Sequence, residues 1–215
     1  MRIEDSLKLF KFENQQYESS FTIKPDSTEL VLFPAQTEQA SEDTFEKAEK
    51  LITPQGVKDK SVLKYAPEPD IVIAGEKKKA GIVVDISKNI LYRYDKDGNP
   101  VNAYLIASGK KSTPTDKGIR IVSNKEKYPY KTAVGTKRKR NPKDYGPFVL
   151  VLKKIDTETG EQTRTGEFIH GCRSYEKTFE STPDRYVSHG CMRMDNDVIK
   201  ELASIVEKGE IVIIK

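Results

Sequence analysis

The chain has 215 residues, of which 36% are hydrophobic and 33% are charged, and its formal net charge is +4. This length is sufficient for one or two domains with hydrophobic cores, and the balance of residues is typical of a globular protein with a well-solvated surface. No apolar run approaches the roughly 20 residues that cross a bilayer, and the first residues lack the apolar stretch of a secretory signal. We therefore expect no integral membrane segment; either the protein is cytoplasmic, or the sequence is given without its export segment.

Charge is distributed unevenly along the chain. Residues 1–50 contain 6 Lys/Arg and 11 Asp/Glu, whereas residues 108–143 contain 12 Lys/Arg and 2 Asp/Glu. The densest basic run is 137–140, and a basic patch of this kind attracts nucleic acid, anionic membrane or acidic polymer. Because glycine and proline flank the run, and no aromatic interleaving or nucleic-acid motif accompanies it, we interpret it as a solvated loop and expect no nucleic-acid partner.

The first 68 residues give mixed signals about structure. Residues 30–33 are apolar and precede a proline, which predicts a short buried strand. Asp43 is a candidate helix N-cap with a glutamate three residues later, which predicts a short helix through Ile52.

A linker is expected between residues 58 and 70, where the chain is polar and contains prolines. We therefore divide the chain into a small N-terminal segment, residues 1–68, and a second domain, residues 69–215. The fold and the role of the first segment stay open.

Strand signals dominate from residue 71 onward. β-branched and aromatic runs are separated by turn residues, and the run 97–100, Asp-Gly-Asn-Pro, predicts a hairpin. Asp195 is a candidate N-cap, and the apolar residues after it fall at helical spacing until Gly209, which predicts one late helix. Many short strands and one late helix indicate a mainly β domain, either a sandwich or a barrel. The expected strands are residues 71–73, 81–86, 90–94, 101–107, 119–123, 148–153 and 167–169 before the helix and 211–214 after it.

The two histidines and two cysteines of the chain occur in two copies of one tripeptide, His-Gly-Cys, at 170–172 and 189–191. Thiol and imidazole together form either an activated nucleophile or a metal site. In each tripeptide one residue separates the two side chains, which does not match the ligand spacing of structural zinc sites. We therefore favour a nucleophile and expect no metal, although a Cys172–Cys191 disulfide, which would silence both thiols, stays open.

The second tripeptide has the surroundings that a nucleophile needs. Gly190 permits a backbone conformation that a bulkier residue would resist, so that consecutive N–H groups beside Cys191 can point at a developing oxyanion. Arg193 follows two residues later, on the same side of an extended chain, where it would hold a substrate carboxylate or form a structural salt bridge.

These residues resemble a known family. The run 188–194, Ser-His-Gly-Cys-Met-Arg-Met, with His170 upstream, is similar to the active-site signature of the L,D-transpeptidases, also called the YkuD-domain family. The resemblance covers about residues 80–215 and implies an L,D-transpeptidase-like β-sandwich or barrel as the catalytic domain. Other segments that resemble the family are 83–94, 107–118, 145–148 and 168–171, together with the late helix and the last strand.

The resemblance implies a catalytic pair. Cys191 is then the nucleophile and His170 its base, and the backbone carbonyl of Gly171 orients the imidazole. One departure is Cys172, which stands where the family usually has a small or hydroxylated residue; such a thiol could bridge to Cys191, bind metal or be inert.

The resemblance also implies supporting roles. The backbone N–H groups around Gly190 and Cys191 form the oxyanion hole, and Ser188 and Arg193 support the loop and the substrate. His189 is a secondary member of the site that positions other groups rather than transferring protons.

The activity that the resemblance implies is acyl transfer on the stem peptides of peptidoglycan, with no cofactor. An acyl-enzyme forms at the third stem residue with release of D-alanine, and a second stem resolves it to a 3→3 cross-link. Such a protein acts outside the cytoplasmic membrane, in the periplasm or cell wall. Its oligomeric state stays open.

Several alternatives share or replace this chemistry. Water as the acceptor would make the protein an L,D-carboxypeptidase, a D-amino acid would make it an exchange enzyme, and a lipoprotein lysine would make it an anchoring enzyme. The alternative of another class is a non-catalytic module that binds zinc or the wall.

Overall fold

The computed structural model describes residue 47 and residues 50–130, 145–172 and 185–215. The strand predicted at 30–33 and the basic run 137–140 lie outside the described residues. Most of the helix predicted from Asp43 also lies outside them, but Ile52 belongs to a strand, so the expectation that the helix extends through Ile52 is wrong.

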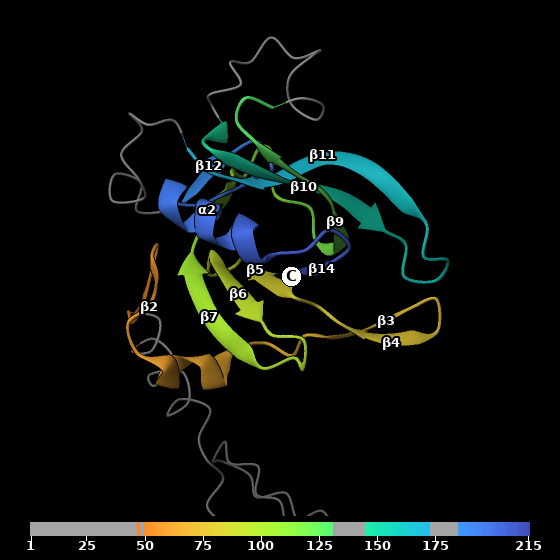
Figure 1. The fold of residues 1–215 in the computed structure, drawn as a ribbon, viewed down its shortest axis with the longest axis horizontal. Coiled ribbons are helices and arrows are strands. Elements are labelled where there is room, and N and C mark those ends of the chain that lie inside the picture. The colour runs from red at the N-terminus through yellow and green to blue at the C-terminus, as the bar shows by residue number, and fades with distance from the viewer. Residues whose placement is uncertain (1–46, 48–49, 131–144, 173–184) are drawn as a thin grey trace, which may run out of the picture. The chain divides into compact units, whose positions relative to one another are not determined.

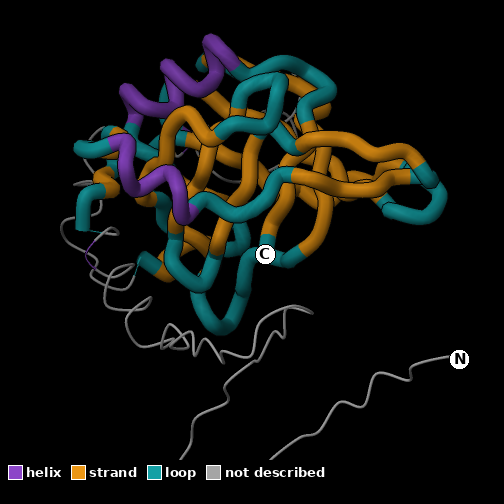
Figure 2. The backbone as a smooth tube through the Cα atoms, turned by 90° about the horizontal axis from the view of Figure 1, so that it is seen from below, coloured by secondary structure: helices purple, strands orange, loops and turns teal. Residues whose placement is uncertain are grey.

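Strands are the main regular structure of the described chain (Figures 1 and 2). Every strand predicted from residue 71 onward overlaps an observed one, and the single late helix is present, so the mainly β prediction is confirmed. The elements are β1 (Ile52–Thr53), β2 (Gly56–Val57), the 3-10 helix η1 (Lys60–Tyr65), β3 (Asp70–Ile73), β4 (Glu76–Lys79), β5 (Ile82–Asp85), β6 (Ile90–Tyr94), β7 (Pro100–Leu105), β8 (Ser108–Gly109), β9 (Gly118–Lys127), β10 (Phe148–Ile155), β11 (Gln162–His170), β12 (Tyr186–Ser188), β13 (Met192–Arg193), α2 (Asn196–Ile205) and β14 (Ile211–Ile214).

The main sheet has eight strands in the order β13-β11-β10-β9-β14-β5-β6-β7. The last strand, β14, lies in the middle, parallel to β5 and antiparallel to β9, and therefore joins the two halves of the sheet. At one edge β13 pairs in parallel with β11. This edge carries both predicted catalytic tripeptides, because β11 ends at His170 and β13 begins after Cys191.

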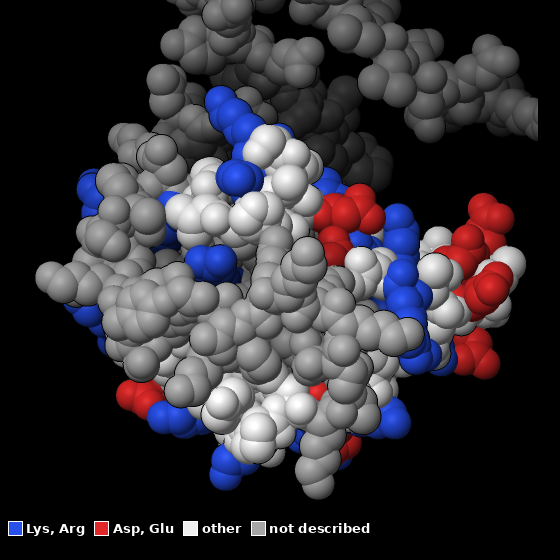
Figure 3. Space-filling view, turned by 90° about the horizontal axis from the view of Figure 1, so that it is seen from above, with Lys and Arg blue, Asp and Glu red and all other residues white. Residues whose placement is uncertain are grey.

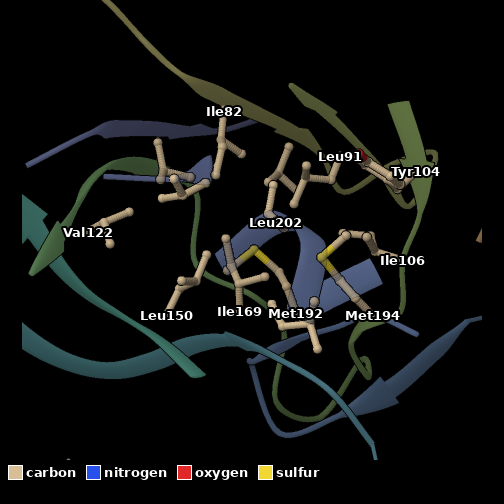
Figure 4. Close-up of a cluster of buried hydrophobic side chains, with 14 of the residues drawn as sticks. Ile82, Leu91, Tyr104, Ile106, Val122, Leu150, Ile169, Met192, Met194 and Leu202 are labelled. Carbon is tan, nitrogen blue, oxygen red and sulfur yellow. The ribbon is translucent and has the colours of Figure 1, made fainter. Parts of the chain in front are cut away.

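Both faces of the sheet are buried, because apolar residues occupy successive positions of its central strands. Ile82 and Val84 point to one side of β5 and Val83 to the other, as the alternation of side chains along a strand requires. The side with Ile82 is covered by α2, and we call its buried residues the first core cluster (Figure 4). The opposite side is covered in part by residues 50–66. The first core cluster consists of Ile82, Val84, Leu91, Tyr104, Ile106, Val122, Leu150, Leu152, Ile169, Met192, Met194, Val198, Ile199, Leu202, Ala203, Val206, Val212 and Ile214.

Helix α2 begins as the sequence predicts. The Asp195 side chain accepts a hydrogen bond from the backbone N–H of Asp197 at 3.0 Å, which is the contact of an N-cap. Val198 and Leu202 are one turn apart and both face the sheet. The helix ends at Ile205, earlier than predicted, and Gly209 lies in the turn to β14 with a φ of +99°.

Residues 58–65 are not the linker that composition suggests. They include η1, whose Val62 and Leu63 are buried together with Ile52 on the side of the sheet to which Val83 points. The strand just before them is also attached, because the backbone N–H of Val57 donates to the Asn102 side chain at 3.1 Å. A separate role for residues 1–68 stays a prediction.

The surface of the described residues carries both signs of charge. On the face seen in Figure 3, the Lys and Arg side chains of the described part are dispersed rather than gathered into one patch. Within the described residues no helix is both long enough and apolar enough to cross a membrane.

Candidate active site

The second tripeptide lies directly beside the first at the edge of the main sheet. In the parallel pairing of β11 with β13, Ile169 is opposite Met192 and His170 is opposite Arg193. On the other side of β13, Arg193 exchanges two backbone hydrogen bonds with Ala107, at 2.7 and 3.0 Å. The segment that follows Cys191 is therefore held from both sides.

The alternation of side chains in β13 decides which way Cys191 faces. Met192 and Met194 are fully buried and point into the first core cluster, beside Leu202 (Figure 4). Cys191 and Arg193 alternate with these methionines and so project to the opposite side of the strand.

The same rule places His170 on that side. Its neighbour Ile169 points into the first core cluster, so His170 projects the other way. Both side chains meet one group of residues, which we call the aromatic cluster: Cys191 packs against it, and the His170 ring contacts Tyr145 with 4.9 Å between ring centroids. The structure thus places Cys191 and His170, which the family resemblance pairs as nucleophile and base, against the same aromatic cluster. The aromatic cluster consists of Tyr130, Tyr145, Val149 and Phe168.

The hydrogen bond of the His170 ring defines which nitrogen carries the proton. Nδ1 lies 2.6 Å from the carbonyl oxygen of Gly171, the contact that the family resemblance implies. A carbonyl oxygen can only accept, so Nδ1 carries the hydrogen, and in a neutral ring Nε2 is then the acceptor.

The ring is neutral at physiological pH. Burial lowers the pKa of His170 from 6.5 to about 3, and the positive charge of Arg193 acts in the same direction, while the hydrogen bond to Gly171 opposes both. Burial has this effect because an imidazolium loses more hydration than a neutral imidazole does. The site therefore holds an imidazole with one unprotonated nitrogen, which is the form that a general base needs.

The turn before Cys191 is held by Ser188. The Ser188 hydroxyl donates to the carbonyl oxygen of Cys191 at 2.5 Å and accepts from the N–H of Gly190 at 3.1 Å. Gly190 has a φ of +105°, which side chains disfavour, so a glycine is required there as predicted. In this geometry the Gly190 N–H holds the turn; an oxyanion hole at Gly190 and Cys191 stays a prediction. His189 is exposed between buried Ser188 and Gly190.

Thr115 braces the same turn, a role that sequence reasoning missed. Its hydroxyl donates to the carbonyl oxygen of Gly190 at 3.0 Å and accepts from the N–H of Gly109 at 2.9 Å. The side chain is buried, so bulk water could not replace either hydrogen bond if the hydroxyl were removed. Thr115 belongs to a segment that resembles the family, but nothing in the sequence connects it to a residue 75 positions away.

We expect Thr115→Val to lower the free energy of unfolding by about 1–3 kcal/mol, because it keeps the shape of the side chain and leaves two buried backbone groups without partners. Urea denaturation measures the effect. Thr163→Val is the matched control, since Thr163 is exposed on β11. Equal stabilities of the two variants would contradict this role of Thr115.

A buried arginine anchors the turn that contains Thr115. Arg120 is fully buried and forms ion pairs with Glu167 at 2.7 Å and with Asp116 at 3.1 Å. Lys154 also contacts Asp116, and its hydrogen bond is the largest of the effects that lower the pKa of that carboxyl. The Asp116 side chain thus ties the turn to β9 and β10.

Cys172 has surroundings different from those of Cys191. Its side chain is buried, and Sγ lies 3.6 Å from the carbonyl oxygen of Met194. The two cysteines, both described, are not joined by a disulfide. Among the described residues, no group of three or more His, Cys, Asp or Glu is arranged to hold a metal ion.

Comparison with known families decides the relationship that the signature suggests. The model of the YkuD family, the L,D-transpeptidase catalytic domain, matches residues 79–214. The chain belongs to this L,D-transpeptidase family. The matched residues include both tripeptides and all eight strands of the main sheet. A search among curated proteins found no match.

Solved structures similar to this L,D-transpeptidase domain include members of the same family. A mutant of Enterococcus faecium L,D-transpeptidase is 28% identical, with 63% of this chain and 49% of that chain covered and a TM-score of 0.45. The catalytic domain of the E. faecium enzyme is 27% identical, with 64% and 98% covered and a TM-score of 0.42. An L,D-transpeptidase from Mycobacterium smegmatis is 20% identical, with 69% and 68% covered and a TM-score of 0.41. The chain spans about half the length of the first of these.

Proposed function

We propose that the protein is a cysteine acyltransferase that acts on peptidoglycan stem peptides and forms 3→3 cross-links. The observation that carries the proposal is the neutral, buried His170, whose Nδ1–H is held by the Gly171 carbonyl, on the same side of β11 and β13 as Cys191. Family membership supports a peptidoglycan transpeptidase in general. The acyl-enzyme and the type of cross-link are our proposals.

The first half-reaction makes an acyl-enzyme. Nε2 of His170 accepts the proton of the Cys191 thiol as the sulfur attacks the carbonyl carbon at the L-centre of the third stem residue, typically diaminopimelate. Because burial makes a lasting imidazolium unfavourable, the proton moves as the new S–C bond forms. The C–N bond to D-alanine then breaks, and His170 returns the proton to the leaving amine.

The second half-reaction releases the enzyme. The amine of a second stem attacks the thioester, His170 takes the proton from that amine, and the Cys191 thiol is restored with the proton. The product is an amide between two third-position residues. Arg193 lies on the side of the nucleophile and is half-buried, which suits contact with a substrate carboxylate as well as a structural ion pair. The contact between Arg193 and a substrate carboxylate stays a prediction.

The first half-reaction is common to several activities, and the acceptor distinguishes them. Water as the acceptor gives an L,D-carboxypeptidase, and a D-amino acid gives exchange. All of these act on peptidoglycan, so we place the protein outside the cytoplasmic membrane, in the periplasm or cell wall.

The test is to incubate the purified protein with disaccharide-tetrapeptide and to measure the products by mass spectrometry. We expect dimers that have lost one D-alanine, together with an enzyme mass raised by one disaccharide-tripeptide acyl group. Tripeptide without dimers would overturn the transpeptidase proposal in favour of the carboxypeptidase. An unmodified enzyme that carries stoichiometric zinc would favour the non-catalytic module.

A further inference from the structure

The peptide between Gly171 and Cys172 has hydrogen-bond partners at both of its ends. Its carbonyl oxygen, that of Gly171, accepts from Nδ1 of His170 at 2.6 Å. Its N–H, that of Cys172, donates to the side-chain oxygen Oδ1 of Asn196 at 2.9 Å. Because a peptide is planar and trans, its C=O and N–H point in opposite directions, and fixing one fixes the other.

Asn196 occupies a space made by two glycines. A Cβ atom on Gly171 would lie 2.3 Å from Asn196 Oδ1, and one on Gly146 would lie 2.6 Å from it. Both distances are far below van der Waals contact, so neither position accepts a side chain without displacing the amide. Gly146 also has a φ of +69°, which side chains disfavour. The backbone is thus shaped to let this amide reach the peptide after His170.

Asn196 projects from a rigid element of the fold. It is the first residue of α2, directly after the N-cap Asp195, and α2 is anchored by its buried residues in the first core cluster. The side chain thus projects from a rigid element onto the end of β11. The amide contacts the peptide through its acceptor oxygen, and accepting from the N–H polarises the peptide and strengthens the carbonyl as an acceptor.

We propose that Asn196 is a positioning residue for the base: it holds the Gly171–Cys172 peptide so that its carbonyl keeps the proton of His170 on Nδ1. This inference rests on the proposed function in that His170 acts through Nε2. Without Asn196 the peptide plane can rotate, the carbonyl leaves Nδ1, and the neutral ring then also populates the form with the proton on Nε2, which cannot accept a proton from Cys191.

The test compares Asn196→Ala and Asn196→Asp with wild type. Alanine removes the acceptor, whereas aspartate keeps an oxygen at the same place. Asp197→Ala is the matched control, because Asp197 lies on the same turn, and its side chain is exposed and pairs with Lys200. Nitrogen-15 NMR of the imidazole rings reports directly which nitrogen is protonated, and with two histidines in the chain a His189→Gln sample assigns the signals. The second measurement is the rate of acylation by a carbapenem, followed by intact mass.

For wild type and Asp197→Ala we expect one protonated nitrogen, Nδ1, at His170. For Asn196→Ala we expect the two ring nitrogens to move toward averaged shifts and acylation to slow about 10- to 100-fold, as misplacement of a reacting group does. Asn196→Asp is expected to restore the wild-type spectrum and most of the rate. Asn196→Ala with an unchanged His170 spectrum would overturn the proposal, and so would a failure of Asn196→Asp to restore it. Wild type that is not acylated would count against the proposed function, while the spectra would still decide the role of Asn196.

Discussion

Replacing Cys191 with alanine is expected to abolish covalent labelling by a carbapenem, whereas Cys172→Ala is expected to retain it. The thiol adds to the β-lactam carbonyl and opens the ring, so the enzyme mass rises by the whole mass of the reagent. Cys191 is partly accessible and faces the side of His170, while Cys172 is buried with its sulfur near the Met194 carbonyl. Loss of a nucleophile lowers the rate of such a reaction by at least about 1,000-fold. Intact-mass spectrometry over a time course measures both variants.

Labelling with and without a reductant is the control for this comparison. The two thiols are not joined in the structure, so we expect the same labelling rate of wild type in both conditions. Labelling of Cys191→Ala at Cys172 would contradict the assignment of the nucleophile. Labelling of wild type only after reduction would instead show that the two cysteines do form a disulfide in solution.

The long strands could be predicted from the sequence because their residues carry the pattern themselves. β6 and β10 contain β-branched and aromatic residues bounded by turns, and they are found where the sequence places them. The two-residue strands β8 and β13 carry no such pattern, since their pairing depends on β12 and β11, which are distant in the chain. η1 was missed for a related reason: its polar composition hides two apolar residues that the sheet buries.

The candidate site divides in the same way. The candidate nucleophile and base could be proposed from the sequence, because thiol and imidazole are rare in this chain and the family resemblance pairs Cys191 with His170; their catalytic roles stay a proposal. Thr115 and Asn196 could not, since a threonine or an asparagine is ordinary anywhere on a surface. Their roles arise from contacts with Gly190 and with Cys172, 75 and 24 residues away along the chain. The fold brings these pairs together, and the sequence has no local signal for it.

Acid is expected to destabilise the protein through His170. The pKa of this histidine is about 3 in the folded state, against about 6.5 in an unfolded chain, so between these pH values the unfolded state binds a proton that the folded state does not. Stability must then fall as the pH falls through this window. This loss of stability is about 2 kcal/mol between pH 7 and pH 5, reaches about 4 kcal/mol at pH 3 and approaches about 5 kcal/mol below that. Urea denaturation at pH 7 and pH 5 measures it.

Carboxylates also titrate in acid, so the pH effect of His170 has to be separated from theirs by substitution. His170→Gln removes the titrating group, and His189→Gln is the matched control because His189 is exposed. Glutamine loses the packing of the imidazole, so His170→Gln should be less stable than wild type at pH 7. The difference should narrow by about 2 kcal/mol at pH 5, where the wild-type protein bears the cost of keeping the imidazole neutral. For His189→Gln the difference should stay the same at both pH values. A constant difference for His170→Gln would mean that the pKa of His170 in the folded protein is close to its ordinary value of about 6.5, and would contradict the lowering of this pKa by burial.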